Sequence, residues 1–430
     1  MSFLQTSEVL SIDETFPTEV MQLIFSFAIP RIAPDAFHRI QNCSNGLLSG
    51  DPYPDEVREV ILNTSKRWRI MFNATPQAWS TIVPIPGHRC ARRNLERCLD
   101  NSAGELLDVY FPPGVHLVQG WFDTQVFISL LRPHTARFSR FYTHFNPFQE
   151  EILLLQSLFL QENIQHFHLR ELGLSSGDRM MVMTAARVNF PSLTHLALSD
   201  DLMEVFRQLD VGNLRNLTSL RLIFAWRNTE MQDLRLLGFC SRLETLDIEV
   251  QALASYHQNA NGIINLESLK YLKMSVPDPE VAGMLFASVS MPRLTHLVVS
   301  FVSKAERYTS INGILGEGHD HLTHLSIHNT SLQNISLASL PNLTALRLFH
   351  CRLGPASLSR TLDLGSLWKI RLHACQIFVE DVVDLILMRQ KLGLVTRVMT
   401  LDQQGVGLEG LVNEAFGHGD VVYSVRDELG

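Results

Sequence analysis

The chain contains no long apolar run. None of its 430 residues belongs to a stretch near the roughly 18 apolar residues of a membrane-spanning helix, so we expect no transmembrane segment. The N-terminal sequence MSFLQTSEVLSIDETF is acidic and lacks the basic start and apolar core of a secretion signal. We therefore expect a protein of the cytoplasm, the nucleus or both, with no membrane partner.

Cysteine and charge are also scarce. Without a secretion signal, cysteines that show no paired spacing are expected to be reduced and mostly buried thiols. The chain has six: Cys43, Cys90, Cys98, Cys240, Cys351 and Cys375. Charged residues make up 19% of the chain, and the net charge of −8 argues against general nucleic-acid binding.

Motifs of catalysis are missing too. The chain has no G-x-S-x-G, no H-E-x-x-H and no phosphate-binding loop. Gly405–Gly410 matches G-x-G-x-x-G, but only 20 residues follow it, too few for a dinucleotide-binding unit. A histidine-rich cluster lacks the Cys or Glu that would complete a familiar metal site, so we expect neither metal nor cofactor. Its members are His319, Asp320, His321, His324 and His328.

A leucine-spaced hexad, L-x-x-L-x-L, recurs through the C-terminal two thirds of the chain. Ile, Val, Met or Phe replaces some of the leucines, and successive copies start 21 to 29 residues apart. The nine clear copies begin at Ile164, Leu193, Leu217, Leu243, Leu269, Leu294, Leu322, Leu343 and Leu367. This period is typical of leucine-rich repeats, in which each unit gives one short strand and a returning helix or turn.

One such unit cannot bury its apolar edge alone, so neighbouring units must stack around a continuous core. We therefore predict an α/β fold, a curved leucine-rich-repeat solenoid with its strands on the concave face. The regular array extends from residue 164 to about 401, and degenerate units precede it from 84 to about 163. Leu106 and Phe138 start two weak hexads there. Residues 402–430 are expected to form a cap and tail.

Residues 1–83 lack the repeat and are predicted to form a separate helical module. Val20, Leu23, Ile24 and Phe27 are apolar at helical spacing behind Pro17, which fits the first turn of a helix. A Pro- and Gly-punctuated insertion at about 30–54 follows. A second helical pattern then runs from Val57 to Met71 and stops before Pro76.

Two motifs in this module resemble the F-box. Phe16-Pro17-Thr18-Glu19-Val20 with Ile24-Phe25 is similar to the F-box opening, L-P-x-E-[VI]-L-x-x-I-F. Lys66-Arg67-Trp68-Arg69 followed by Thr75-Pro76-x-x-Trp79 is similar to its close. The chain looks especially like the F-box/leucine-rich-repeat proteins of mushroom-forming fungi, which often carry an insertion between the two motifs. Phe16 and Ala78 replace the usual leucines.

The resemblance implies that the module docks on a Skp-type adaptor, which links it to a cullin–RING ubiquitin ligase. The family's contact motif maps onto Phe16, Pro17, Val20, Ile24 and Phe25. Their apolar side chains would enter a hydrophobic groove of the adaptor. Trp68 and Trp79 are expected to build the module's own core. The alternative is that residues 1–80 only cap the repeats.

Alternation along each strand predicts which side chains face outward. The first, fourth and sixth hexad residues point into the core, and the third, fifth and seventh point away from it. The outward residues proposed to bind a target are His168, Arg170, His195, Arg221, Tyr271, Lys273, His296, His324, His328, Arg347, Arg371 and His373. This set is basic although the chain is acidic, so we expect an acidic or phosphorylated protein target.

The sequence thus predicts a substrate-recognition subunit of an SCF-type ubiquitin ligase, without catalytic residues of its own. A ligase-independent repeat scaffold that binds a protein partner is the main alternative. An enzyme that uses the histidine-rich face is a third class. It would require a metal or a substrate-sized pocket near His319–His328.

Overall fold

The computed structural model describes most of the repeat array and both halves of the N-terminal module. The described residues are 16–29, 54–83, 91–111, 124–145, 168–176, 190–199, 209–224, 235–250, 263–302, 309–310, 319–334, 339–354, 366–377, 379–393 and 397–401, with single residues at 158, 206, 315, 337 and 358. Most of the 30–54 insertion, the start of the Ile164 hexad, Gly405–Gly410 and the 402–430 cap lie outside them. The chain divides into two compact units, Met1–Asn213 and Leu214–Gly430.

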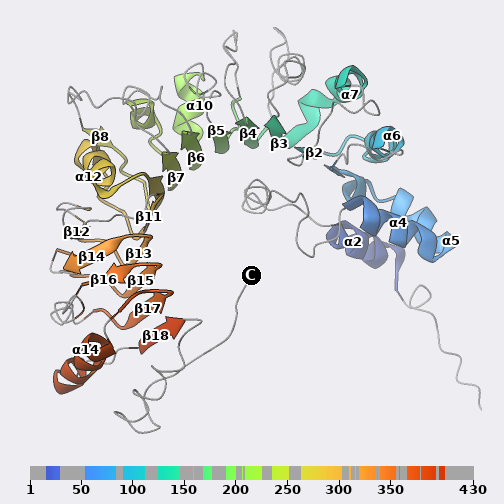
Figure 1. Ribbon diagram of the computed structural model, residues 1–430. Helices are drawn as coiled ribbons and strands as arrows, with labels where there is room; N and C mark the ends of the chain where they lie inside the picture. The colour runs from blue at the N-terminus through green and yellow to red at the C-terminus, as the bar shows by residue number, and fades with distance from the viewer. Residues whose placement is uncertain are drawn as a thin grey trace, which may run out of the picture. The chain divides into compact units, whose positions relative to one another are not determined.

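The first unit opens with short helices (Figure 1). They are α2 (Thr18–Ala28), α4 (Pro54–Thr64), α5 (Lys66–Asn73) and the 3-10 helix η1 (Pro76–Trp79). The continuous helical pattern expected from Val57 to Met71 is broken at Ser65. This residue is extended and its side chain accepts a hydrogen bond from the backbone N–H of Trp68 at 3.1 Å, so it caps a new helix.

Five parallel strands follow in the first unit, in the order β1–β2–β3–β4–β5. They are β1 (Thr81–Ile82), β2 (Leu107–Phe111), β3 (Phe138–Phe145), β4 (Glu171–Ser176) and β5 (His195–Ser199). The intervening helices are α6 (Ala91–Asn101), α7 (Thr124–Leu131) and η2 (Arg132–Arg137). Both weak hexads, from Leu106 and Phe138, are therefore confirmed as strands. The division between the units falls within α10 (Val211–Asn216).

The second unit repeats the same plan with eight parallel strands, in the order β6–β7–β9–β11–β13–β15–β17–β18. They are β6 (Ser219–Phe224), β7 (Thr245–Val250), β9 (Tyr271–Val276), β11 (His296–Phe301), β13 (His324–His328), β15 (Ala345–Phe349), β17 (Lys369–His373) and β18 (Arg397–Leu401). The hexads from Leu193 to Leu367 each supply one of the strands named here or in the first unit, as predicted.

Shorter strands and helices lie in the segments that connect the strands of the second unit. Two parallel sheets pair β8 (Ile264–Asn265) with β10 (Val289–Ser290), and β14 (Ser331–Asn334) with β12 (Thr309–Ser310) and β16 (Arg352–Leu353). The helices are η4 (Arg235–Phe239), α12 (Pro279–Ser288) and α14 (Val379–Lys391). Asp278 caps α12 by accepting a hydrogen bond from the Val281 N–H at 2.9 Å.

Burial along the strands follows the hexad. In β7, β9 and β11 every second residue is buried and the residues between them are partly exposed. The hexad of β9 shows the rule, because Leu269, Leu272 and Met274 are buried while Tyr271 and Lys273 are not. Each leucine buried in this way stabilises the fold by about 1.5–3 kcal/mol. The described residues therefore form a leucine-rich-repeat fold.

Three consecutive repeats turn out of their strands in the same way. Asn329, His350 and Ala374 all adopt positive φ angles, between 48° and 57°. The next residue points inward: the Cys351 thiol donates to the Ile327 carbonyl at 3.4 Å and the Cys375 thiol to the Leu348 carbonyl at 3.2 Å. Each thiol thus joins its repeat to the backbone of the repeat before it.

The cysteines in the described part of the chain are free thiols, as the sequence predicted. They are Cys98, Cys240, Cys351 and Cys375, of which the first three are buried. Burial raises the pKa of Cys98 to about 11 and that of Cys240 to about 12. These thiols therefore carry little of the thiolate that makes a cysteine reactive.

Candidate binding surfaces

Helix α2 presents an apolar face that the described part of the chain leaves uncovered. Its side chains recur at intervals of three and four residues, which places them on one side of a helix. The exposed fractions are 41% at Phe16, 38% at Val20, 57% at Leu23, 44% at Ile24 and 76% at Phe27. We call these five residues the α2 apolar face. Leu23 and Phe27 are its most exposed members and were not among the predicted contact residues.

The opposite side of α2 packs into the helical module. Phe25 is buried, with its ring 5.4 Å from those of Trp68 and Phe72, and the Phe72 and Trp79 rings are 5.1 Å apart. The Trp79 indole N–H donates to the Phe72 carbonyl at 3.1 Å. Phe25 was assigned to the adaptor contact, but its side chain belongs to this aromatic core. Pro17 precedes the helix at its N-cap position.

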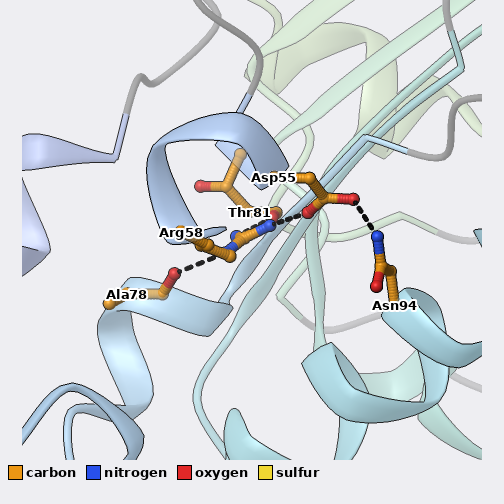
Figure 2. A network of polar contacts seen from close by, with 5 residues as sticks. All are labelled: Asp55, Arg58, Ala78, Thr81 and Asn94. Atoms are coloured by element: carbon orange, nitrogen blue, oxygen red, sulfur yellow. Dashed lines mark hydrogen bonds and ion pairs between the residues drawn. The ribbon is translucent and has the colours of Figure 1, made fainter. Parts of the chain in front are cut away.

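A buried arginine ties this module to the first strand (Figure 2). The Arg58 guanidinium donates to the Ala78 carbonyl at 3.1 Å, to the Thr81 carbonyl and to the Asp55 carboxylate at 2.6 Å. Asp55 also accepts from the Asn94 amide of α6 at 3.2 Å. The network joins α4, η1, β1 and α6, so the helices and the first strand form one packed body.

In the first unit the outward row of the sheet carries an acid, a base and an acid on consecutive strands, followed by a histidine. Asp108, Arg140, Glu171 and His195 are register partners along β2, β3, β4 and β5. The Arg140 Nε lies 3.1 Å from a Glu171 oxygen. Arg140 lies within ion-pair distance of Asp108 on one side and of Glu171 on the other, so the described charges of this row are paired with one another.

The neighbouring row is aromatic and buried. The rings of Tyr110 and Tyr142 stack with centroids 5.3 Å apart and planes 4° apart. The Tyr142 hydroxyl donates to Glu171 at 2.7 Å, and a Cβ added at Gly173 would overlap the Tyr142 ring. Burial, with the Glu171 charge next, raises the pKa of Tyr142. Tyr142 is therefore a neutral donor that holds Glu171 in place.

The hexad of the β4 repeat was placed wrongly. Its strand begins at Glu171, which is in register with Arg140 and His195, so the hexad is Leu169–Leu174 and does not start at Ile164. His168 consequently precedes the hexad, and Arg170 occupies its second position. Both side chains are exposed, but neither lies in the outward rows of the strand. His195 lies in the predicted row, with its Nδ1 2.9 Å from the Thr194 hydroxyl oxygen.

In the second unit the predicted residues lie in three rows across the strands. The first row contains Ser219, Thr245, Tyr271, His296, His324, Ala345 and Lys369; the second contains Arg221, Asp247, Lys273, Val298, Ser326, Arg347 and Arg371; the third contains Ile223, Glu249, Ser275, Ser300, His328, Phe349 and His373. The structure therefore brings nine predicted target-binding residues together on one face of one sheet. Tyr271, His296 and His324 are register partners on consecutive strands, and so are Arg347 and Arg371.

The histidines of this face form one ring stack and one group of tilted rings. The His296 and His324 rings have centroids 4.2 Å apart with planes 9° apart, and each Nδ1 lies 2.9 Å from the hydroxyl of the preceding threonine. Further along, the Phe349 ring lies between His328 at 4.6 Å and His373 at 5.3 Å. The planes of the second group are tilted, by 32° between His328 and Phe349 and by 56° between Phe349 and His373. The face thus carries a band of aromatic rings.

These histidines contribute little positive charge. Burial and then the charge of Arg347 lower the pKa of His296. Burial, His296, Arg347 and Lys369 lower the pKa of His324. Burial lowers the pKa of His328 to about 4, with smaller effects from His350 and Lys273. The charge of the face at neutral pH therefore comes from its arginines and lysines.

The charges of the face divide into a paired and an unpaired group. Asp247 lies 3.6 Å from the Arg221 Nε and 3.2 Å from the Lys273 Nζ, so two predicted cations share one carboxylate. Arg347 and Arg371, which are register partners, have no hydrogen bond or ion pair among the described residues. The pairing could not be read from the sequence, because it depends on which strands are neighbours.

The described residues contain no group of three or more side chains that could hold a metal ion, and no helix long and apolar enough to cross a membrane. In the histidine-rich cluster, His319 is buried, and its Nε2 lies 2.9 Å from the Leu315 carbonyl oxygen. His319 thus packs inside the fold, against Leu315 and the Phe286 ring.

Comparison with known proteins gives neither a family nor a curated relative. No family model matches the chain, and no curated protein matches it. Among solved structures, an internalin from Listeria monocytogenes aligns with a TM-score of 0.41 and 16% identity, over 77% of this chain and 92% of the internalin. A structural-genomics target from Bacteroides fragilis aligns with a TM-score of 0.33 and 16% identity, over 50% of this chain and 66% of that protein.

Proposed function

We propose that this leucine-rich-repeat protein is a substrate receptor of an SCF-type ubiquitin ligase. Its N-terminal module would dock on a Skp-type adaptor, and the outward face of its repeats would bind a protein target. The observation that carries the proposal is the α2 apolar face. Four exposed apolar side chains on α2, with Phe16 just before its N-cap, form a surface of the kind that protein partners cover.

The core behind that face also fits the F-box resemblance. The residues of the closing motif, Trp68 and Trp79, pack with Phe25 of the opening motif in one aromatic cluster. The two motifs, separated by about 40 residues in the sequence, thus belong to one small helical body. Phe16, Val20 and Ile24 remain on its surface as adaptor contacts, joined by Leu23 and Phe27.

Catalysis would be by proximity. A receptor that holds its target beside the ubiquitin-charged enzyme raises the local concentration of the target's lysines. Such a receptor benefits from a firm connection between its adaptor-binding module and the first strand of its sheet. The Arg58 network supplies that connection within the first unit, where it anchors α4 to η1 and β1. A role of this kind belongs in the cytoplasm or the nucleus.

Capture by the adaptor tests the proposal. The full chain, co-expressed with a Skp-type adaptor, is expected to co-purify with it. The variant Ile24→Asp/Phe27→Asp should lose at least about tenfold of that capture, because two charges would enter an apolar interface. Val60→Asp is the matched control, since Val60 is 68% exposed on α4 and lies outside the proposed interface. Equal capture of both variants, or none by the native chain, would contradict the proposal.

A ligase-independent scaffold is the second candidate, and one observation favours it. Arg58, Trp79 and the first strand are buried together, as expected if the helices serve to cap the open end of the repeats. In that case the native chain would bind its protein target but leave the adaptor uncaptured. The same co-purification therefore separates the two candidates.

A further inference from the structure

Near its C-terminal end, the outward face of the second unit includes a segment that carries positive charge and no acidic residue. This segment comprises β13, β15 and β17, whose sequences are HLSIH, ALRLF and KIRLH. Ser326, Arg347 and Arg371 are consecutive register partners in its middle row, and Lys369 stands in the row beside them. Neighbouring strands lie about 4.8 Å apart, so the two arginine side chains start from adjacent positions on β15 and β17.

Two adjacent like charges destabilise a sheet unless an anion joins them. Elsewhere on this face the chain provides that anion itself, since Arg221 and Lys273 both lie near Asp247. Arg347 and Arg371 receive none from the described residues. The Arg371 Nε is buried and makes no hydrogen bond among them. A donor that is shielded from water and unpaired is costly in the free protein and is satisfied by a ligand that accepts from it.

The surroundings are suited to a phosphorylated side chain. A phosphate ester carries close to two negative charges at neutral pH and offers three acceptor oxygens. Two guanidinium groups match both the charge and the forked geometry of such an anion, whereas a carboxylate would neutralise only one of them. The Ser326 hydroxyl lies in the same row, and the His328, Phe349 and His373 rings form an aromatic border for the rest of the ligand.

We propose that Arg347 and Arg371 form a phosphate-binding site that recognises a phosphorylated segment of the protein target. The inference rests on the proposed function for the role of this face in target recognition. It narrows the predicted basic surface to one part of it. Arg221 and Lys273 each form an ion pair with Asp247, although the Arg221 Nε makes no hydrogen bond, whereas Arg347 and Arg371 have no ion pair among the described residues. His296, His324 and His328 would border the site as neutral rings, and Lys369 would support the field of the two arginines.

Peptide libraries test the site without knowledge of the target. The full chain is incubated with three immobilised degenerate nonapeptide libraries that differ only at the central residue: phosphoserine, serine or glutamate. Retention on the phosphoserine library should exceed retention on the serine library by at least about tenfold, with the glutamate library in between. Vesicles containing phosphatidylserine form a fourth arm and are expected to retain little protein.

The variant Arg347→Gln/Arg371→Gln should lose the preference for phosphoserine while keeping its thermal stability, because its removal of two like charges relieves repulsion. Arg347→Lys/Arg371→Lys keeps the charge but not the forked donors and should retain only part of the preference. Arg242→Gln/Arg293→Gln, two exposed arginines of the same unit, is the matched control and should bind like the native chain.

Equal retention of the phosphoserine and serine libraries would overturn the inference. So would unchanged binding by Arg347→Gln/Arg371→Gln, or retention by vesicles alone. Adaptor capture depends on α2 and is measured separately. The phosphate-site inference can therefore be contradicted while the receptor proposal stands, and the receptor proposal can be contradicted while the phosphate site stands.

Discussion

At the scale of single residues, Gly173 shows how tightly the first unit is packed. Its backbone lies directly beneath the Tyr142 ring, which stacks on Tyr110 and bonds Glu171. Because Tyr142 is buried, its ring cannot move aside without breaking the stack and the hydrogen bond. The position requires glycine for space.

Gly173→Ala should therefore destabilise the protein by about 1–3 kcal/mol, the usual range for overpacking a filled core. The free energy of unfolding is measured by urea denaturation of the full chain. Gly212→Ala in α10 is the control, since a Cβ there meets only the Asp210 carboxylate, at an ordinary 3.4 Å. If the two variants are equally stable, the close contact between Gly173 and Tyr142 does not exist.

His328 gives the second unit a pH dependence. Its pKa is lowered from 6.5 to about 4, by burial first and then by His350 and Lys273, and it lies 2.9 Å from the Ser326 hydroxyl. As the pH falls from 6.5 towards 4, the unfolded chain binds a proton that folded His328 does not bind. The native state therefore loses stability across this window and is unaffected by this group above it.

The melting temperature of the native chain should accordingly fall between pH 6.5 and pH 4. His328→Gln, which cannot take up the proton in either state, should show a smaller fall. His373→Gln serves as the comparison on the neighbouring strand. Identical pH profiles for the native chain and His328→Gln would show that His328 titrates normally.

At the scale of elements, the Arg58 network decides how firmly the helical module is joined to the repeats. Arg58→Met would leave the carbonyls of Ala78 and Thr81 without their side-chain donor. It would also remove the ion-pair partner of the part-buried Asp55 carboxylate, which would keep only its hydrogen bond from Asn94. Breaking a buried pair in this way costs about 3–5 kcal/mol. We expect faster hydrogen exchange in η1 and β1 and a lower free energy of unfolding.

The matched control is Arg92→Met. Arg92 pairs with Glu96 one turn away on α6, but the two side chains are 66% and 39% exposed, so the change should cost less than about 1 kcal/mol. If Arg58→Met is no more harmful than Arg92→Met, the network does not hold the module to the first strand.

The strands could be predicted where the sequence shows both a buried apolar face and an exposed polar face. The hexads from Leu193 to Leu367 fixed their strands because inward leucines alternate with outward polar residues. The pattern failed at Ile164 because IQHFHL and LRELGL, five residues apart, both satisfy the spacing, and only the register with Arg140 and His195 selects the second. A single strand does not contain that information.

The binding surfaces were predicted less completely for a similar reason. Leu23 and Phe27 belong to the helical pattern that the sequence shows, but the contact residues were taken from the family motif, which does not assign these two to the contact. The same period separates Phe25 from that face. The unpaired state of Arg347 and Arg371 depends on neighbouring strands and on the position of Asp247, which only the folded sheet defines.

At the scale of the whole molecule, the chain carries two candidate surfaces of different chemistry. The α2 apolar face suits an interface driven by burial, and the β13–β15–β17 segment suits an anion. The net charge of −8 makes that cationic segment an exception to the chain as a whole. A local field opposite in sign to the rest of the molecule favours the correct orientation of an acidic target on approach.

The central claim is that α2 is the docking helix of a ligase receptor. Hydrogen exchange of the full chain, measured with and without a Skp-type adaptor, tests it most directly. We predict that adaptor binding slows exchange in Thr18–Ala28 and leaves β15 and β17 unchanged. Unaltered exchange in Thr18–Ala28, whether because no complex forms or because the adaptor protects another segment, would contradict the account.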